Sequence, residues 1–219
     1  MAEFDRFAGN YRAVLDDSVG SAAYFADGKA QWLRGLLGPA FCGRVLDFGC
    51  GVGLLSAAML REWPQLKLTC FDVSTDSLAS VPAAVHERAV LCAQERELGD
   101  GYDLIVVSNV LHHVPLADRD ALLQSLVARL TSGGRLVVFE HNPLNPLTRW
   151  VVSHCAFDDD AVLLWPSEAL RRLQAAGLQA PRRAWVAFVP PVLGRLRRWE
   201  PWLHRLPFGA QYVAWGSRA

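Results

Sequence analysis

Short apolar runs alternate along this chain with longer stretches in which apolar residues recur at helical spacing. Such runs are typical of strands buried on both faces of a sheet, and the longer stretches are typical of amphipathic helices. The pattern predicts strands over 44–48, 67–72, 89–93, 102–108, 135–140, 184–189 and 211–215. It predicts helices over 54–63, 76–81, 118–130 and 167–176. Because strands and helices alternate, we expect an α/β fold with a mostly parallel sheet and helices on both of its faces.

Turn signals fix some of the predicted boundaries. The glycine-containing segment from Thr131 to Gly134 predicts a turn that ends the helix over 118–130. Ser167 is the expected N-cap of the helix over 167–176, and Gly177 is expected to end it.

The composition narrows the class of protein. A chain of 219 residues suffices for one α/β domain. The charges of the 22 basic and 22 acidic residues cancel, so the protein has no overall positive field of the kind that general nucleic-acid binders use. A local basic patch is still compatible with this composition. Five cysteines without a C-x-x-C pair indicate neither a zinc site nor a disulfide framework. Without a leader pattern or a membrane-length apolar run, we expect a cytoplasmic protein, and the abundance of Arg, Ala, Gly and Pro suggests a bacterial source with a GC-rich genome.

The most informative segment is the loop directly after the first predicted strand, where glycines alternate at Gly49, Gly51 and Gly53. Residues without a Cβ can adopt positive φ and let the backbone approach a ligand closely, and the following helix would direct its first N–H groups at the same ligand. Asp47, just before the glycines, can accept hydrogen bonds from an ammonium group. The spacing differs from the dinucleotide fingerprint G-x-G-x-x-G, although a nicotinamide site and a purely structural turn remain alternatives.

This block resembles the first motif of the class I S-adenosylmethionine (SAM) dependent methyltransferases, acid-x-Gly-x-Gly-x-Gly. The resemblance covers roughly residues 40–217. It implies a single-domain, Rossmann-like sheet of seven strands with an antiparallel last strand. It also implies that the cofactor SAM, which leaves as S-adenosylhomocysteine, is held at its methionine end by Asp47, Gly49, Cys50, Gly51 and Gly53.

Further cofactor residues follow the next strands. Asp72 ends the second predicted strand, where an acid can bind both ribose hydroxyls; a dinucleotide enzyme would use the same acid. The resemblance places Val73 near the adenine. At the end of the third strand the family often has an acid for the adenine amino group, where this chain has Ala93, Gln94 and Glu95, and Gln94 could supply an amide acceptor instead.

The segment from Tyr102 to Val114, which ends in Leu-His-His-Val, resembles the fourth-strand region of the ubiquinone/menaquinone-type and other small-molecule methyltransferases. In that arrangement Asn109 would line the boundary between cofactor and acceptor. Three histidines follow predicted strands at their carboxyl ends, where α/β proteins bind ligands. Because an imidazole can take a proton near neutral pH, we favour His112 as a catalytic base, then His141, with His113 structural. For each of them the alternative is a helix cap or a bond to a backbone carbonyl.

Other segments allow two interpretations each. Residues 1–38, rich in aromatic side chains, are expected to form a helical lid in which Tyr11 covers the cofactor, ahead of a catalytic domain over 39–219; the rings could instead pack only on the sheet. Asn142, Asn145 and Arg149 could bind a polar acceptor, or the asparagines could form turns. The acids Asp158, Asp159 and Asp160 suggest a solvated loop rather than a metal cluster, and we expect no metal.

The segment 195–205 combines arginines with tryptophans. It fits peripheral docking on an anionic membrane or an acidic carrier protein, or a helix whose tryptophans pack on the sheet or on a dimer partner. We expect a monomer or a homodimer.

The sequence therefore predicts a SAM-dependent methyltransferase that acts on a small acceptor, aromatic, quinone, polyketide or lipid-like, in bacterial specialised metabolism, without a nucleic-acid partner. Alternatives are a SAM-binding protein of the same fold that does not transfer methyl, and a methyltransferase of protein or RNA. The segment from Ser108 to Leu111 lacks the Asn/Asp-Pro-Pro-Tyr pattern of enzymes that methylate base amines.

Overall fold

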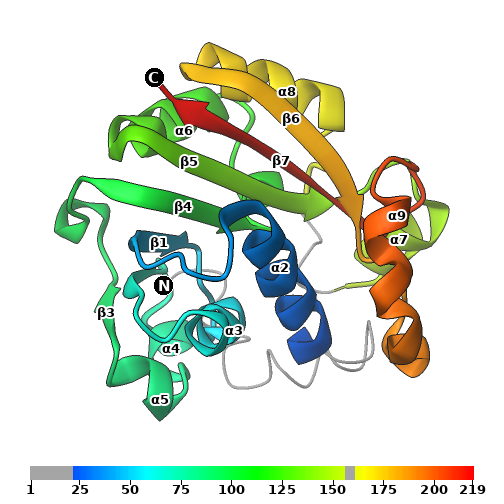
Figure 1. Ribbon diagram of the computed structural model, residues 1–219. Coiled ribbons are helices and arrows are strands. Elements are labelled where there is room, and N and C mark those ends of the chain that lie inside the picture. Colours follow the sequence, from blue (N-terminus) through cyan, green and yellow to red (C-terminus); the bar gives the residue numbers. More distant parts are fainter. Residues whose placement is uncertain (1–21, 156–160) are drawn as a thin grey trace. The chain divides into compact units, whose positions relative to one another are not determined.

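The computed structural model describes residues 22–155 and 161–219 (Figure 1). Its sheet has seven strands in the order β3-β2-β1-β4-β5-β7-β6. The strands are β1 (Arg44–Phe48), β2 (Lys67–Phe71), β3 (Ala89–Cys92), β4 (Tyr102–Ser108), β5 (Leu130–His141), β6 (Leu178–Val186) and β7 (Gln211–Arg218). Strands β1, β2 and β3 are parallel, whereas β7 is antiparallel to both β5 and β6. The predicted fold class, a mostly parallel seven-stranded sheet with an antiparallel last strand, is confirmed.

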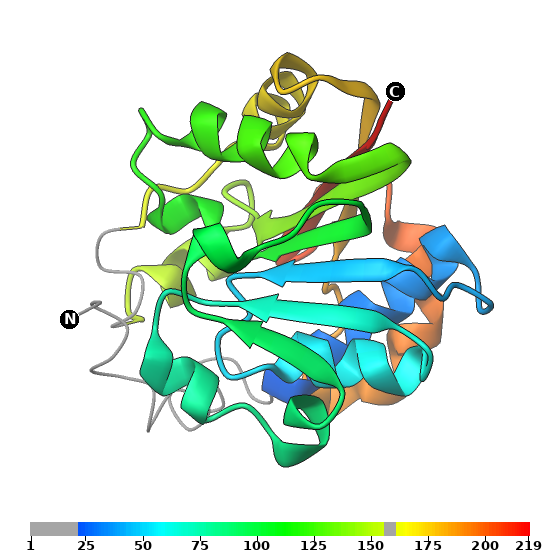
Figure 2. The same ribbon diagram turned by 90° about the vertical axis from the view of Figure 1, so that its left-hand side faces the viewer.

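The chain divides into two compact units, Met1–Leu104 and Ile105–Ala219, so the division falls inside β4. The first unit contains β1 to β3, whose parallel course can be followed in Figure 2. Its helices are α2 (Ala22–Leu37), α3 (Leu54–Glu62), α4 (Thr75–Ala79), α5 (Ala83–His86) and the short 3₁₀ helix η2 (Glu95–Glu97). Helix α2 packs on α3, and Arg34 of α2 pairs with Glu62 of α3 at 2.9 Å.

The second unit contains β5, β6 and β7, on which α8 packs against the last two strands. Its other elements are η3 (Leu111–His113), α6 (Arg119–Ala128), α7 (Pro146–Val152), α8 (Pro166–Ala175), η4 (Pro191–Trp199) and α9 (Glu200–Leu203). The apolar middle of β5 lies in the core: Val137, Val138 and Phe139 are 0 % exposed. Tyr212 is equally buried, and its hydroxyl donates to the Leu164 carbonyl at 2.9 Å.

Three predicted boundaries are wrong. The turn expected from Thr131 to Gly134 is part of β5, which begins at Leu130 and accommodates Gly133 with a φ of 77°. Helix α8 has Trp165, not Ser167, at its N-cap, because Pro166 occupies the first helical position. Strand β6 begins at Leu178 rather than 184; it is an edge strand, so its exposed arginines do not produce an apolar run.

Some expectations fall on residues without a described structure. Tyr11, most of the expected lid over 1–38, and Asp158 to Asp160 lie outside the described residues. Within 22–155 and 161–219, no group of three or more His, Cys, Asp and Glu side chains is arranged to hold a metal ion. All five cysteines are free thiols. Of the helices in the described part of the chain, none combines the length and the apolar character needed to cross a bilayer.

Candidate functional site

The loop after β1 has the backbone that its glycines predicted. Gly49, Gly51 and Gly53 have φ values of 75°, 53° and 73°. L-residues with a Cβ rarely adopt this left-handed region, so glycine is needed at each position. The N–H groups of Gly49 and Cys50 donate to the Phe71 carbonyl at 2.8 and 2.9 Å, which anchors the loop to the end of β2. The result is a fixed stretch of backbone without side-chain atoms at three of its positions.

Asp72 holds the middle of this loop. Its Oδ2 accepts a hydrogen bond from the Gly51 N–H at 2.7 Å, and its Oδ1 accepts one from the Ser74 N–H at 2.9 Å. Ser74 in turn caps α4, since its hydroxyl oxygen accepts from the Ser77 N–H at 3.1 Å. The carboxylate assigned to the ribose therefore also joins the ends of β1 and β2.

Asp47 lies on β1 with 1 % of its surface exposed. Its Oδ2 accepts a hydrogen bond from the Ser56 hydroxyl at 2.6 Å. Burial raises the pKa of Asp47 to about 6, and the neighbouring Asp72 adds to this, while the Ser56 hydrogen bond and the Lys29 charge act in the opposite direction. A buried carboxylate of this kind is stabilised in its ionised form by a nearby cation.

Cys50 is buried within the loop. Its Sγ donates to the Gly51 carbonyl at 3.5 Å. The hydrogen bond to Cys70 and the burial of the thiol raise the pKa of Cys50 well above its usual range. The side chain is therefore a neutral thiol, and it contributes packing rather than charge to the loop.

The residues assigned to the adenine lie in the loops after β2 and β3. Val73 is 59 % exposed although it is apolar. The N–H groups of Ala93 and Gln94 donate to Glu97 Oε2 at 3.1 and 3.2 Å, which shapes the turn after β3. Gln94 itself is exposed. The first unit thus brings the predicted methionine, ribose and adenine residues to the carboxyl ends of its three strands, apart from Tyr11.

Asn109 and the three histidines belong to the second unit. Asn109 has a φ of 57°, and its N–H donates to the Phe139 carbonyl at 2.9 Å. Its Oδ1 accepts from Gln211 Nε2 at 3.2 Å. The left-handed backbone turns the chain sharply after β4 and directs it into η3, which carries His112 and His113.

The imidazoles form one cluster. The ring of His112 lies 4.1 Å from that of His113 and 5.1 Å from that of His141, measured between centroids. Sequence reasoning missed the carboxylate that contacts this cluster, Glu140, which is 0 % exposed. Its Oε2 lies 2.5 Å from His112 Nδ1, and its Oε1 accepts from the Leu111 N–H at 2.8 Å.

Glu140 is ionised despite its burial. Burial alone would raise its pKa, but His112, His141 and the Leu111 N–H together lower it below its ordinary value. His112 Nδ1 lies within hydrogen-bond distance of this carboxylate. A carboxylate on Nδ1 fixes the tautomer of an imidazole and stabilises the imidazolium that forms when Nε2 takes a proton.

Arg119, also missed, fixes the backbone that carries His112. It is 1 % exposed, and its guanidinium donates to the carbonyls of Val114 at 2.9 Å and Val162 at 2.7 Å. The Val162 N–H donates to the His112 carbonyl at 2.9 Å. Burial lowers the pKa of Arg119, and the charge of Glu140 partly offsets this. For Glu140 and Arg119, the two missed residues, the only sign in the sequence was one acid, Glu140, near the end of the apolar strand β5.

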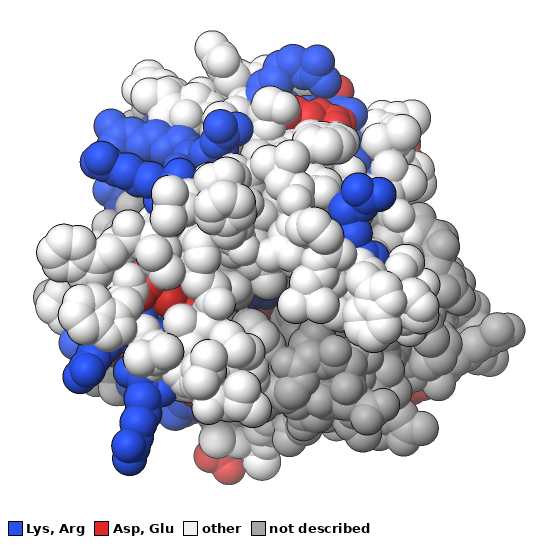
Figure 3. All heavy atoms as spheres, turned by 90° about the vertical axis from the view of Figure 1, so that its right-hand side faces the viewer, with Lys and Arg blue, Asp and Glu red and all other residues white. Residues whose placement is uncertain are grey.

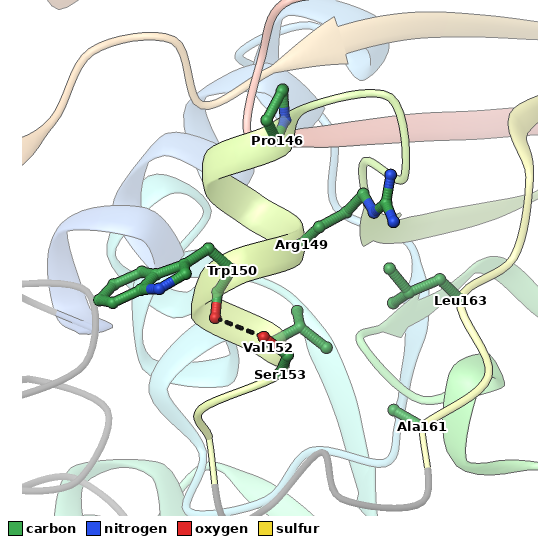
Figure 4. Close-up of a pocket in the computed structure, with 7 residues that line it drawn as sticks. All are labelled: Pro146, Arg149, Trp150, Val152, Ser153, Ala161 and Leu163. Atoms are coloured by element: carbon green, nitrogen blue, oxygen red, sulfur yellow. Dashed lines mark hydrogen bonds between the residues drawn. The ribbon is translucent and has the colours of Figure 1, made fainter.

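A groove of about 610 Å³ lies beside α7 (Figure 4). Trp150, Val152 and Leu163 supply much of its apolar wall, and Arg149 supplies a charge. Asn142 and Asn145 do not line it. Asn142 Nδ2 donates to the Pro207 and Gly209 carbonyls at 3.1 and 2.7 Å, and Asn145 caps α7. The asparagines therefore form turns and caps, and of the three residues considered for acceptor recognition only Arg149 faces the groove.

Comparisons with known proteins bear on the family and the fold. Residues 46–136 match the family model described as a methyltransferase domain. Ribosomal RNA small subunit methyltransferase C of Shewanella sp. (strain MR-4) is 36 % identical over 98 residues, which are 41 % of this chain and 28 % of that relative. The chain spans less than half the length of the curated relatives it matches.

Two solved structures resemble nearly the whole chain. A SAM-dependent methyltransferase from Archaeoglobus fulgidus superposes with a TM-score of 0.71 at 15 % identity, covering 95 % of this chain and 100 % of that one. Magnesium protoporphyrin IX methyltransferase from Synechocystis PCC 6803, solved with bound S-adenosylhomocysteine, gives a TM-score of 0.71 at 16 % identity over 99 % and 96 % of the two chains. The resemblance is confirmed: the chain has the class I methyltransferase fold, and its residues 46–136 match the methyltransferase domain.

Proposed function

We propose that the protein transfers the methyl group of SAM to a small acceptor and releases S-adenosylhomocysteine. The observation that carries the proposal is the loop after β1, in which three glycines have positive φ and the Gly51 N–H is held by Asp72. The methyltransferase-domain match and the two full-length structural neighbours support it.

The groups of the first unit fit SAM. The buried Asp47 suits the ammonium of its methionine end, and the half-buried Asp72 suits a ribose diol. The exposed Val73 offers an apolar surface for the adenine, with Ala93 and Gln94 on the next loop. Gly53 is also required by packing, because a Cβ there would lie 3.0 Å from the Val81 side chain.

When bound, SAM supplies a methyl group on a sulfonium, which is an electrophile that needs positioning rather than activation. The acceptor atom must lose a proton if it is a hydroxyl or an ammonium. We assign this proton to His112 Nε2, because Nδ1 faces Glu140. Glu140 then stabilises the imidazolium, and Arg119 keeps the backbone of η3 in place. His141 is the second candidate for the base, and His113 is structural.

A small acceptor is supported by the histidine cluster and by the groove beside α7. A volume of about 610 Å³ suits a small molecule, and Arg149 is a counter-charge for an acidic group on it. The resemblance to small-molecule enzymes extends to the Synechocystis neighbour, which is named for a porphyrin acceptor. We place the acceptor among aromatic, quinone, polyketide or lipid-like compounds of bacterial specialised metabolism.

An RNA acceptor is the second candidate, because the curated relatives methylate ribosomal RNA by name. The loop from Ser108 to Leu111 lacks the Asn-Pro-Pro-Tyr type of motif that amine methylation of bases uses. Incubation with radiolabelled SAM and either total RNA or a small-molecule extract separates the candidates: label in the RNA would contradict a small acceptor. A protein that binds SAM without transferring methyl would label neither fraction.

The Asp72→Ala variant is expected to bind SAM at least tenfold more weakly, a loss of ~1.4 kcal/mol or more, because it removes the ribose carboxylate and its bond to Gly51. Isothermal titration calorimetry measures the change. Glu87→Ala, an exposed carboxylate at the end of α5 in the same unit, serves as the matched control and should bind SAM like the wild type. Equal affinity of the Asp72 variant and the control would contradict the ribose assignment.

The affinity for SAM is expected to fall as the pH drops through about 6, the pKa of Asp47. The direction follows from charge: the carboxylate attracts the ammonium, and the protonated form present at lower pH does not. Calorimetry at several pH values should show this loss for the wild type and a flat profile for Asp47→Asn over the same range. A wild-type affinity that rises on acidification would exclude an ammonium next to Asp47.

The His112→Ala variant is expected to lower kcat roughly hundredfold or more and to remove the acidic limb of the pH–rate profile. Glu140→Gln should lower kcat and shift that limb, because the amide stabilises the imidazolium less well than a carboxylate. The affinity for SAM, measured in parallel, should stay unchanged in both. His86→Ala, a surface histidine in α5, is the control with normal kinetics. If His112→Ala retains the wild-type profile and His141→Ala loses it, the base is His141.

A further inference from the structure

Exposed apolar side chains concentrate in two short segments of the second unit. Ten of the fifteen large apolar residues that are exposed in the described chain lie within 144–150 and 192–208. On and before α7 they are Leu144, Leu147 and Trp150. In η4, α9 and the loop that follows they include Val192, Trp199, Trp202 and Phe208. Apolar exposure at this density marks an interaction surface.

Hydrogen bonds hold the two segments together as one surface. Asn145 Nδ2, at the start of α7, donates to the Phe208 carbonyl at 2.8 Å. Thr148 Oγ1, one turn later, donates to the Ala210 carbonyl at 2.9 Å. We call the exposed residues of 144–150 and 192–208 the α7–α9 face. In Figure 3 the side of the molecule that carries α7 and α9 is mainly uncharged, with Lys and Arg groups toward its margins.

The charge of the α7–α9 face is positive. Arg149, Arg195, Arg198 and Arg205 are exposed. Segments 144–150 and 192–208 contain a single acidic residue, Glu200. Its side chain is turned inward: the residue is 9 % exposed, and Oε1 accepts from the Phe188 and Val189 N–H groups at 2.9 and 2.8 Å. The arginines therefore have no exposed carboxylate within the two segments.

The shape and chemistry of the face favour a bilayer over RNA and over a second copy of the chain. Val192 and Trp202 are 89 % and 81 % exposed, so their side chains protrude from the surface. Protruding apolar side chains can insert into the boundary between lipid head groups and acyl chains. Six of the ten apolar residues are Val or Leu, which have no aromatic ring to stack on bases but suit the apolar part of a bilayer. A second copy bound symmetrically through this face would bring arginines against arginines.

We propose that the α7–α9 face docks on an anionic lipid bilayer. The leucine, valine and aromatic side chains enter the boundary between head groups and acyl chains, and the arginines bind lipid phosphates while their aliphatic stems stay in the apolar layer. The protein then sits on the membrane surface. The groove beside α7 shares Pro146 and Trp150 with this surface, which gives a lipid-like acceptor a short route from the bilayer.

Vesicle flotation with the full-length protein tests the proposal. The protein is expected to float with vesicles of phosphatidylcholine and phosphatidylglycerol, to float far less with phosphatidylcholine alone, and to be released by high salt. Arg195→Gln/Arg198→Gln should weaken partitioning roughly 25-fold, since each arginine contributes about a fivefold factor near an anionic surface. Trp202→Ala and Val192→Ser should each weaken it severalfold.

Two controls match these changes in residue type. Arg171→Gln/Arg182→Gln removes two exposed arginines from α8 and β6, and Val90→Ser replaces a valine that is 62 % exposed on β3. Both should float like the wild type. The proposal fails if anionic vesicles do not recruit the protein, if the face variants and the controls partition equally, or if the face variants instead abolish RNA binding or self-association. The vesicle experiment uses no SAM, so its outcome is independent of the proposed methyl transfer.

Discussion

The loop after β1 is the constraint on which the rest of the first unit depends. Three alternate residues must adopt positive φ, and the N–H groups of Gly49, Cys50 and Gly51 must find acceptors at the end of β2. Glycine meets the first requirement, and Phe71 and Asp72 meet the second. Asp47 is buried on β1 just before this loop, α3 begins directly after its last glycine, and Val73 is exposed on the next loop. The same few contacts therefore fix the loop and the residues that we propose for SAM binding.

The second unit rests on a different interaction, an ionised carboxylate in a fully buried place. Glu140 can remain charged because His112, His141 and the Leu111 N–H surround it. Arg119 adds a buried cation, which donates hydrogen bonds to the backbone carbonyls of Val114 and Val162. Burying such groups costs far more than leaving them in water, and well-packed hydrophobic residues of similar size often stabilise a fold as well or better. This cost supports the proposal that the cluster serves chemistry rather than folding.

Sequence reasoning identified the parts of the protein whose conformation is local. All seven strands and the left-handed glycines follow from runs of apolar residues and from the missing Cβ atoms. The edge strand β6 starts earlier than predicted because its solvent-facing arginines obscure the pattern. Glu140 and Arg119 were missed because their role depends on contacts between distant segments: Glu140 meets a histidine 28 residues away, and Arg119 binds a carbonyl 43 residues away. Asn142 and Asn145 were ambiguous for the same reason, since their partners lie in the loop at 207–209.

We propose that the glycine loop and Asp72 bind the adenosyl and methionyl parts of SAM. The sharpest test is a crystal structure of the protein grown with S-adenosylhomocysteine. We expect the ligand to lie against the backbone of Gly49 to Gly53, with both ribose hydroxyls within hydrogen-bond distance of the Asp72 carboxylate. A well-ordered structure in which the ligand binds elsewhere, or in which Asp72 makes no contact with the ribose, would contradict it.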